Sequence, residues 1–266
     1  MVPVGRQDGT VTARLPGPDV VIGGAPRSGT TFLCELLAKH PSVFIARPFI
    51  PEPKVCMTPH PEGDPGLLQR YADIFSKAPP RSIRIEKTSY YLENAEARER
   101  LIRVLPHAKF IFILREPVER AYSNWMRSRL NGLETLPFEE AVDRELDRVS
   151  PLAPDQAYAR PFDYLTRGRY GTLVEAWIRA VGRERMAIYI FEAALATPEA
   201  FVEDLQRFIG VNPLPWSALA TERINAIERG PDGLSKETAA ALREKMRPEV
   251  ERLARIAKLD VTIWGY

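Results

Sequence analysis

The feature that most constrains this chain is a glycine-rich turn between an apolar run and a helical pattern. Residues 20–33 read VVIGGAPRSGTTFL, which predicts a buried strand over 20–23 and, after the turn, a helix over 30–39. At such a junction the free backbone N–H groups of the helix start can point at one anion, and the helix dipole favours negative charge there. The stretch therefore predicts an anion-binding loop in an α/β fold.

The loop lacks the residue that an ATP-binding loop requires. In the pattern G-x-x-x-x-G-K-[ST] a lysine directly follows the second glycine. Here Gly24 and Gly29 have the required spacing, but Thr30 stands in the lysine position. The charge of Arg27 and the hydroxyl groups of Thr30 and Thr31 remain to hold the anion. Because no strand-end aspartate is evident for magnesium, a Mg-ATP site is disfavoured.

Composition favours one ordinary globular domain and excludes several kinds of partner. The chain has 266 residues, of which 45% are hydrophobic and 27% charged, enough to bury a sizeable core. A formal net charge of +2 gives no reason to expect a nucleic-acid partner. Two cysteines without a Cys/His cluster indicate neither a disulfide framework nor a metal site. No uncharged apolar run is long enough to cross a bilayer, so we expect no membrane partner and a cytoplasmic location.

The order of predicted elements indicates the fold class. Strands are predicted over 20–23, 83–86, 109–114 and 186–190, and helices over 30–39, 66–75, 95–105, 118–129, 138–149, 170–181, 198–209 and 236–257. Alternating strands and helices favour a mostly parallel sheet with right-handed crossovers. Prolines crowd residues 46–65, which predicts an excursion lying over the sheet. We expect a single α/β domain with a P-loop-like central parallel sheet flanked by helices, spanning 19–266 after a loose leader at 1–18.

A second motif follows the clearest strand. The run FIFILREPVERAYSNW places Arg115 at the strand end and Ser123 eight residues later, in the second turn of the next predicted helix. A guanidinium and a hydroxyl together suit a phosphate monoester, because they supply charge and a directed hydrogen bond. Taken alone, the pair is explained better by an exposed arginine and a solvent-facing serine. Two such motifs in this order, each at a strand end, are far more specific than either one.

Together the motifs resemble a known family. PRSGTTFL resembles the 5′-phosphosulfate loop of sulfotransferases that use 3′-phosphoadenosine 5′-phosphosulfate (PAPS), and the family's 3′-phosphate motif, Arg-x-Pro-x-x-Arg-x-x-Ser, is matched by Arg115, Pro117, Arg120 and Ser123. The chain is most similar to the glycosaminoglycan-type (heparan sulfate) enzymes and their bacterial relatives. The resemblance implies a 5′-phosphosulfate site built from Arg27, Ser28, Gly29, Thr30 and Thr31. It likewise assigns the 3′-phosphate to Arg115 and Ser123.

Arg27 and a late glycine-containing stretch also bear on the donor site. Arg27 occupies the family's lysine position, which keeps the charge but replaces a compact ammonium with a planar fork. ERGPDGLSK, with Arg229 and Gly230, is similar to the late loop that closes on the 3′-phosphate in cytosolic sulfotransferases. An ordinary turn before the last helix explains this pattern nearly as well.

The resemblance also implies catalytic residues. Glu52, in RPFIPEPKV, resembles the glutamate base of glycosaminoglycan sulfotransferases, and His60 in the same proline-rich segment is the other candidate base. Lys87, in IEKTSYYL, resembles the lysine of Glu-Lys-Thr-Pro-x-Tyr, with Ser89 in the proline position. In that branch the lysine lies in the active site, so Lys87 and Arg27 are expected to stabilise developing charge. If these cations cover the charge, no metal is required.

The resulting expectation is transfer of a sulfuryl group from PAPS to an acceptor hydroxyl on a sugar or natural product, with PAP as product. The acceptor is a small molecule or a carbohydrate, and residues 46–65, the pair Tyr90–Tyr91 and the end of the helix at 118–129 are candidates for its pocket. Two alternatives stay open: a P-loop kinase that uses Mg-ATP on a small metabolite, and a non-catalytic protein that binds PAP. The sequence does not indicate an oligomeric state.

Overall fold

A single parallel sheet lies at the centre of the computed structural model, which describes residues 15–219 and 233–266. Its strands are β1 (Val20–Gly24), β2 (Val43–Ile45), β3 (Ile83–Lys87), β4 (Lys109–Leu114) and β5 (Met186–Ile190). They are ordered β2-β3-β1-β4-β5, with every neighbouring pair parallel. The order reverses at β1, since the strands that follow it lie on both of its sides. In such sheets ligands bind outside the carboxyl ends of the strands at this point.

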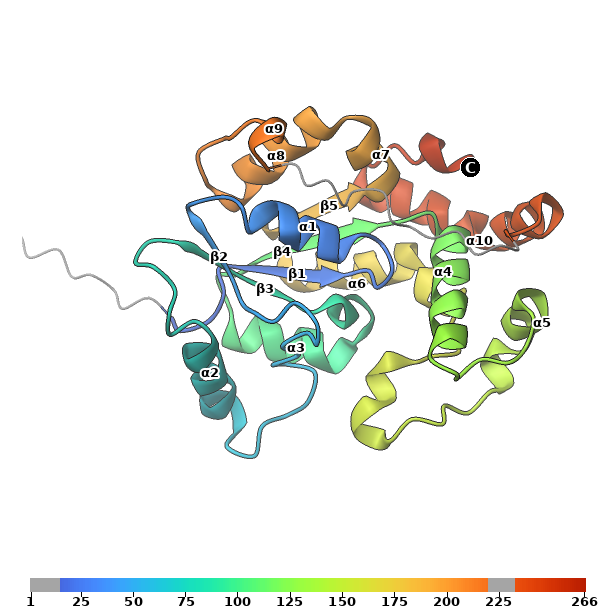
Figure 1. Ribbon diagram of the computed structural model, residues 1–266, viewed down its shortest axis with the longest axis horizontal. Coiled ribbons are helices and arrows are strands. Elements are labelled where there is room, and N and C mark those ends of the chain that lie inside the picture. The colour runs from blue at the N-terminus through green and yellow to red at the C-terminus, as the bar shows by residue number, and fades with distance from the viewer. Residues whose placement is uncertain (1–14, 220–232) are drawn as a thin grey trace, which may run out of the picture.

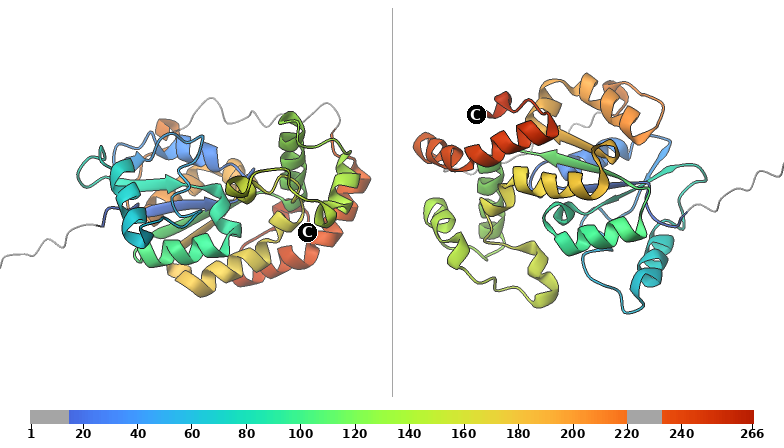
Figure 2. Two further views of the ribbon diagram at one scale, coloured as in Figure 1. Left: turned by 90° about the horizontal axis from the view of Figure 1, so that it is seen from below. Right: turned by 180° about the vertical axis from the view of Figure 1, so that it is seen from behind.

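Helices cover both faces of the sheet (Figure 1). They are α1 (Thr30–Leu37), α2 (Gly63–Ile74), α3 (Ala95–Val104), α4 (Pro117–Leu130), α5 (Phe138–Asp143), α6 (Tyr170–Val181), α7 (Phe191–Ala196), α8 (Pro198–Ile209), α9 (Trp216–Leu219) and α10 (Lys236–Ala257). One buried cluster joins the sheet to α1, α7, α8 and α9, and a second joins it to α2, α3, α6 and α10. A third packs α4 and α5 against α10. Figure 2 shows α6 and α10 running together along one side. The α/β class expected from the sequence is confirmed.

The strand β4, which lies between β1 and β5, shows why its sequence is apolar after Lys109. Phe110 and Phe112 point to one face, where their rings lie 4.9 and 5.0 Å from that of Trp177 on α6. Ile111 and Ile113 point to the other face and join the cluster around α1. All five side chains are fully buried. A strand covered on both faces needs apolar residues at every position rather than at alternate ones.

One strand was not predicted, and one predicted helix was too long. The strand β2 was missed because its three residues are too few to show a periodic pattern. The helix predicted over 138–149 ends at Asp143 and is followed by a short 3₁₀ turn, Glu145–Asp147. The carboxylate of Glu145 accepts hydrogen bonds from the backbone N–H groups of Tyr164, Leu165 and Thr166, so it caps a later segment instead of extending the helix.

Part of the proline-rich excursion at 46–65 lies in the core on the face of the sheet that α2 and α3 cover. Val55, Cys56 and Met57 are buried in the cluster that contains α2 and α3. Of the predicted leader, residues 15–18 are described, and the guanidinium of Arg84 donates to the carbonyl groups of Leu15 and Pro16.

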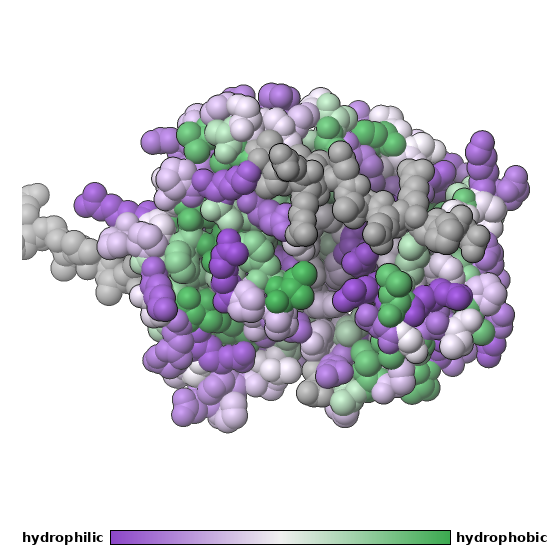
Figure 3. All heavy atoms as spheres, viewed as in Figure 1, coloured by the Kyte–Doolittle hydropathy of each residue, from purple (hydrophilic) through white to green (hydrophobic). Residues whose placement is uncertain are grey.

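The face of the molecule drawn in Figure 3 is mostly hydrophilic, and its hydrophobic groups form separate patches. No membrane-spanning helix occurs in the part of the chain that the structure describes.

Burial makes both cysteines unreactive. Cys34 and Cys56 are free thiols with no exposed surface, and desolvation raises the pKa of each to about 12. Because only the thiolate is a good nucleophile, we expect neither to react with a disulfide reagent near neutral pH until the protein is unfolded. Thiol titration with and without denaturant measures this, and rapid labelling of the folded protein would contradict the burial described.

Candidate functional site

The glycine-rich turn joins β1 to α1 at the reversal point of the sheet. Gly29 caps α1 with a positive φ of 88°, a conformation that glycine adopts without steric cost. A Cβ atom at Gly29 would also lie 2.4 Å from the ring of Phe191, so the turn needs glycine for space as well. The amide of Ala25 donates to the carbonyl of Ile113 (2.8 Å), which ties the turn to β4. The strand–turn–helix arrangement is the one that the sequence predicts.

Within the turn, the described side chains differ in exposure. Ser28 and Thr30 are buried, and the Ser28 hydroxyl has no hydrogen-bond partner in the segments that the structure describes. Arg27 reaches the surface. An unpartnered buried hydroxyl is costly, so a ligand or a water that accepts from Ser28 would stabilise the turn.

A hydrogen bond connects the two sequence motifs. Arg27 Nε donates to Ser123 Oγ on α4 at 3.1 Å, across 96 positions of sequence. Since the serine oxygen accepts this bond, its own proton remains free to donate to a ligand. The two motifs therefore form one site.

Positive charge is concentrated at this junction. Arg115, at the end of β4, is only 8% exposed, and its Nη2 atom lies 3.3 Å from Glu119 Oε2. Loss of solvent, followed by the positive charges of Arg127 and Arg115, lowers the pKa of Arg27. Neighbouring cations repel one another and so disfavour each other's charged form, and an anion placed among them removes this repulsion. The residues present thus fit a ligand that carries phosphate groups.

A second charged group lies at the end of β3. Lys87 is buried, and its Nζ atom is 2.8 Å from Glu52 Oε1. The same ammonium lies 3.4 Å from Thr31 Oγ1 and 3.5 Å from the carbonyl of Phe49. Lys87 therefore bridges the anion-binding turn and the carboxylate in the proline-rich excursion. Three residues from separate motifs meet at this point.

Glu52 is held from more than one side. Its Oε2 accepts from the backbone N–H of Ser89 (3.0 Å) and its Oε1 from the Ser89 hydroxyl (2.8 Å). The side chain is 9% exposed. A proline in place of Ser89 has neither of these donors. The departure from the family pattern thus marks a contact that the sequence does not predict.

His60, the other candidate base, forms its hydrogen bond within its own turn. Its Nδ1 atom accepts from the backbone N–H of Glu62 at 3.2 Å. The ring also covers Gly66, where a Cβ atom would lie 1.9 Å from Nδ1. His60 thus shapes the turn before α2, whereas Glu52 contacts Lys87.

Two tyrosine rings, Tyr90 and Tyr158, form an aromatic wall near Glu52. The rings of Tyr90 and Tyr158 are 5.1 Å apart, and Lys54 Nζ is 2.6 Å from the Tyr158 hydroxyl. Burial raises the pKa of Tyr90, although the positive charge of Arg167 opposes the rise. The sequence indicates Tyr90 as a pocket candidate but carries no motif for Tyr158. Their contact depends on the long segment between α4 and α6.

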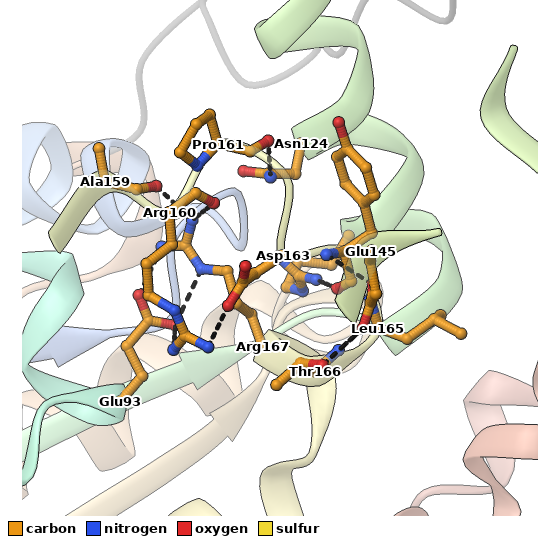
Figure 4. Close-up of polar contacts among 12 residues, drawn as sticks. Glu93, Asn124, Glu145, Ala159, Arg160, Pro161, Asp163, Leu165, Thr166 and Arg167 are labelled. Carbon is orange, nitrogen blue, oxygen red and sulfur yellow. Dashed lines mark hydrogen bonds and ion pairs between the residues drawn. The ribbon is translucent and has the colours of Figure 1, made fainter. Parts of the chain in front are cut away.

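A buried ion pair and two partly exposed ones hold that segment in place (Figure 4). Arg167 donates to both carboxylate oxygens of Glu93 at 2.8 and 2.6 Å and to the carbonyl of Ala159 at 2.9 Å. Arg160 lies between Glu93 and Asp163 and pairs with both. Glu93 ends the 3₁₀ turn η1 (Ser89–Glu93), which also carries Ser89 and Tyr90. One short turn thus positions both Glu52 and the aromatic wall.

The late loop and the expected absence of a metal complete the set of predicted site features. Arg229 and Gly230, predicted as further contacts of the 3′-phosphate, lie outside the described residues. Among the residues that are described, no group of three or more His, Cys, Asp or Glu side chains is arranged to hold a metal ion.

Comparison with known proteins places the chain in a family. Residues 17–228 match the Sulfotransferase domain family. The chain is 25% identical over 203 residues to the mouse bifunctional heparan sulfate N-deacetylase/N-sulfotransferase 3, covering 74% of this chain and 22% of that protein. It is 26% identical over 194 residues to the human heparan sulfate glucosamine 3-O-sulfotransferase 3A1, covering 73% and 44%. The chain thus spans less than half the length of either relative.

Solved structures share the fold. A sulfotransferase from Alicyclobacillus acidocaldarius superposes with a TM-score of 0.75 at 24% identity, covering 94% of this chain and 99% of that one. Mouse sulfotransferase SULT7A1 complexed with PAP gives a TM-score of 0.54 at 16% identity, covering 92% and 89%. With a family match over most of its length, this chain belongs to the sulfotransferase family.

Proposed function

We propose that this protein transfers a sulfuryl group from PAPS to an acceptor hydroxyl, releases PAP and needs no metal. The hydrogen bond from Arg27 to Ser123 carries the proposal, because it merges a 5′-phosphosulfate loop and a 3′-phosphate motif into one cationic site. The fold is shared with a sulfotransferase solved with PAP. A donor with phosphate groups at two positions of its ribose suits a site with two such motifs.

The donor site follows from these contacts. The 5′-phosphosulfate is assigned to Arg27, Ser28, Gly29, Thr30 and Thr31, and the 3′-phosphate to Arg115 and Ser123, with Arg229 and Gly230 as further contacts. Arg115 is buried rather than directed into bulk water, and its charge contributes to the lowered pKa of Arg27. A buried guanidinium close to the glycine-rich turn suits a 3′-phosphate ligand.

The reaction needs a base and stabilising charge. PAPS, when bound, supplies the sulfuryl group. Glu52 accepts the proton of the acceptor hydroxyl, since Ser89 and Lys87 fix its carboxylate beside the turn. Lys87 stabilises the negative charge that develops there, because its ammonium already reaches Thr31. Arg27 adds charge from the other side of the turn.

The alternatives differ in testable ways. A kinase requires Mg-ATP, which the family assignment disfavours, and a PAP-binding protein without activity would not depend on Glu52. The acceptor is proposed to be a small molecule or a carbohydrate; two of the relatives are named for heparan sulfate. A cytoplasmic location stays a prediction.

Ligand preference distinguishes these functions. We expect PAP to raise the melting temperature in the presence of EDTA, because a ligand that binds only the folded state stabilises it by about 2.7 kcal/mol at a hundred times its Kd. ADP and ATP with magnesium should give smaller shifts. Thermal-shift scans with the three nucleotides measure this. Stabilisation by Mg-ATP alone would favour the kinase instead.

Removing one guanidinium tests the 3′-phosphate site. Arg115→Ala should weaken PAP binding about tenfold to a hundredfold, since a hydrogen bond to a charged group contributes about 1.5–3 kcal/mol. Affinity for AMP, which lacks the 3′-phosphate, should stay unchanged. Isothermal titration compares the two nucleotides. Arg179→Ala is the control, because that side chain is 74% exposed and pairs with Glu175 on the same helix; equal losses for PAP and AMP in Arg115→Ala would place Arg115 elsewhere.

The base is tested by a neutral isostere. Glu52→Gln should lower turnover about a hundredfold or more, the usual contribution of a general base, while the Kd for PAP changes less than about twofold. PAP release from PAPS, with a heparan-type oligosaccharide and 2-naphthol as acceptors, measures turnover. Glu62→Gln, an exposed carboxylate of the same excursion, is the matched control. Undiminished turnover in Glu52→Gln would remove Glu52 from the mechanism.

A further inference from the structure

A buried carboxylate next to Lys87 has no role in the reaction described above. Glu86, on β3, has no exposed surface. Its Oε1 accepts from the hydroxyl groups of Thr88 and Tyr91, both at 2.8 Å, and its Oε2 from that of Tyr71 at 2.7 Å. Across the residues that the structure describes, no lysine or arginine forms an ion pair with it. Three hydroxyl donors alone satisfy this carboxylate.

The direction of these hydrogen bonds has a consequence. An ionised carboxylate only accepts, and each hydroxyl has a single proton to donate. Thr88 and Tyr91 therefore give their protons to Glu86 and present lone pairs elsewhere. Those lone pairs accept the backbone N–H groups of Lys54, at 3.0 Å from Thr88 Oγ1, and of Cys56, at 3.1 Å from the Tyr91 oxygen.

These bonds reach the segment that carries Glu52. Residues 52, 54 and 56 are held in succession by Ser89, Thr88 and Tyr91, all from the stretch that follows Glu86. At the C-terminal end of this segment the guanidinium of Arg100 donates to the carbonyl groups of Cys56 and Met57, at 2.8 Å each. In two of the three attachments the acceptor is a hydroxyl oxygen whose proton points toward Glu86 and therefore away from the incoming N–H group.

We propose that Glu86 is a positioning residue: by orienting the hydroxyl groups of Thr88 and Tyr91, it holds residues 52–56 and places the Glu52 carboxylate beside Lys87. This inference rests on the proposed role of Glu52 as base. Desolvation raises the pKa of Glu86 above its ordinary value, which agrees with a carboxylate kept in the core at a cost.

The third donor provides a matched control. The Tyr71 hydroxyl contacts Glu86 and lies 3.5 Å from Cys56 Sγ, but among the described residues it accepts no backbone N–H of the segment. Tyr71→Phe therefore removes one donor from the same carboxylate and leaves both bridges in place. Tyr91→Phe removes the same atom from a residue that forms a bridge.

The experiment compares Glu86→Leu, Tyr91→Phe and Tyr71→Phe by amide hydrogen exchange of residues 52–57 in the full chain. Both bridging hydroxyl groups donate to Oε1, and a leucine side chain has no acceptor oxygen, so it fixes neither hydroxyl proton. We expect exchange at Cys56 to rise about tenfold in the first two variants. In Tyr71→Phe it should change less than about twofold, while the melting temperature falls by a few degrees.

Turnover supplies the functional readout. Glu86→Leu and Tyr91→Phe should lower kcat about tenfold with the PAPS and PAP affinities within about twofold of wild type. In the Glu52→Gln background, Glu86→Leu should cause no further loss, because both changes act through the Glu52 carboxylate.

Each contrary result has a distinct meaning. Unchanged exchange in Glu86→Leu and Tyr91→Phe, equal effects of Tyr71→Phe and Tyr91→Phe, or additive losses in the double variant would each overturn the positioning role. Full turnover in Glu52→Gln alone would instead refute the proposed base, and the exchange data would still report whether Glu86 holds the segment. If Glu86→Leu does not fold, Tyr91→Phe against Tyr71→Phe decides the question.

Discussion

The site depends on two parallel strands that end side by side. In the β1–β3 ladder Ile22 is paired with Lys87, and the amide of Thr88 donates to the carbonyl of Ile22 (3.0 Å). The glycine turn starts two residues beyond Ile22, so the lysine leaves the sheet next to it. Parallel pairing thus places the ammonium against Thr31 in the first turn of α1. Slipping this register by one residue would turn Lys87 to the opposite face.

Charge explains why the same edge of the sheet suits anions rather than cations. β1 ends in a turn of backbone amides, β3 in Lys87 and β4 in Arg115, so three adjacent strands contribute positive potential. The acidic side chains nearby are already bound: Glu52 contacts Lys87, and Glu119 contacts Arg115. These two carboxylates neutralise part of the positive charge, so the cations can lie close together. A phosphate bound among them would neutralise the rest.

The sequence predicted what depends on short runs of residues and missed what depends on the folded chain. The turn at Gly29, the strand before Arg115 and the parallel sheet follow from local patterns of glycine and apolar residues. The contact of Arg27 with Ser123 spans 96 positions, and no local pattern contains it. Tyr158 reaches Tyr90 only because Arg167 and Glu93 anchor an irregular segment. In the sequence Glu86 is only the end of a predicted strand, since nothing in its neighbours shows that three hydroxyl groups converge on it. The roles assigned to Glu52, Lys87 and Arg27 remain predictions.

Departures from the family motif are informative when their contacts are known. Ser89 stands where the related motif has proline, and both of its donors bind Glu52. A proline there would leave Glu52 to Lys87 alone, and an ammonium is a point charge that fixes distance better than direction. The backbone N–H and the hydroxyl of Ser89 fix both, because they approach different oxygens of the carboxylate. In this chain the orientation of the Glu52 carboxylate, the proposed base, is therefore set by residues 86–91, which also supply the ammonium of Lys87 beside it.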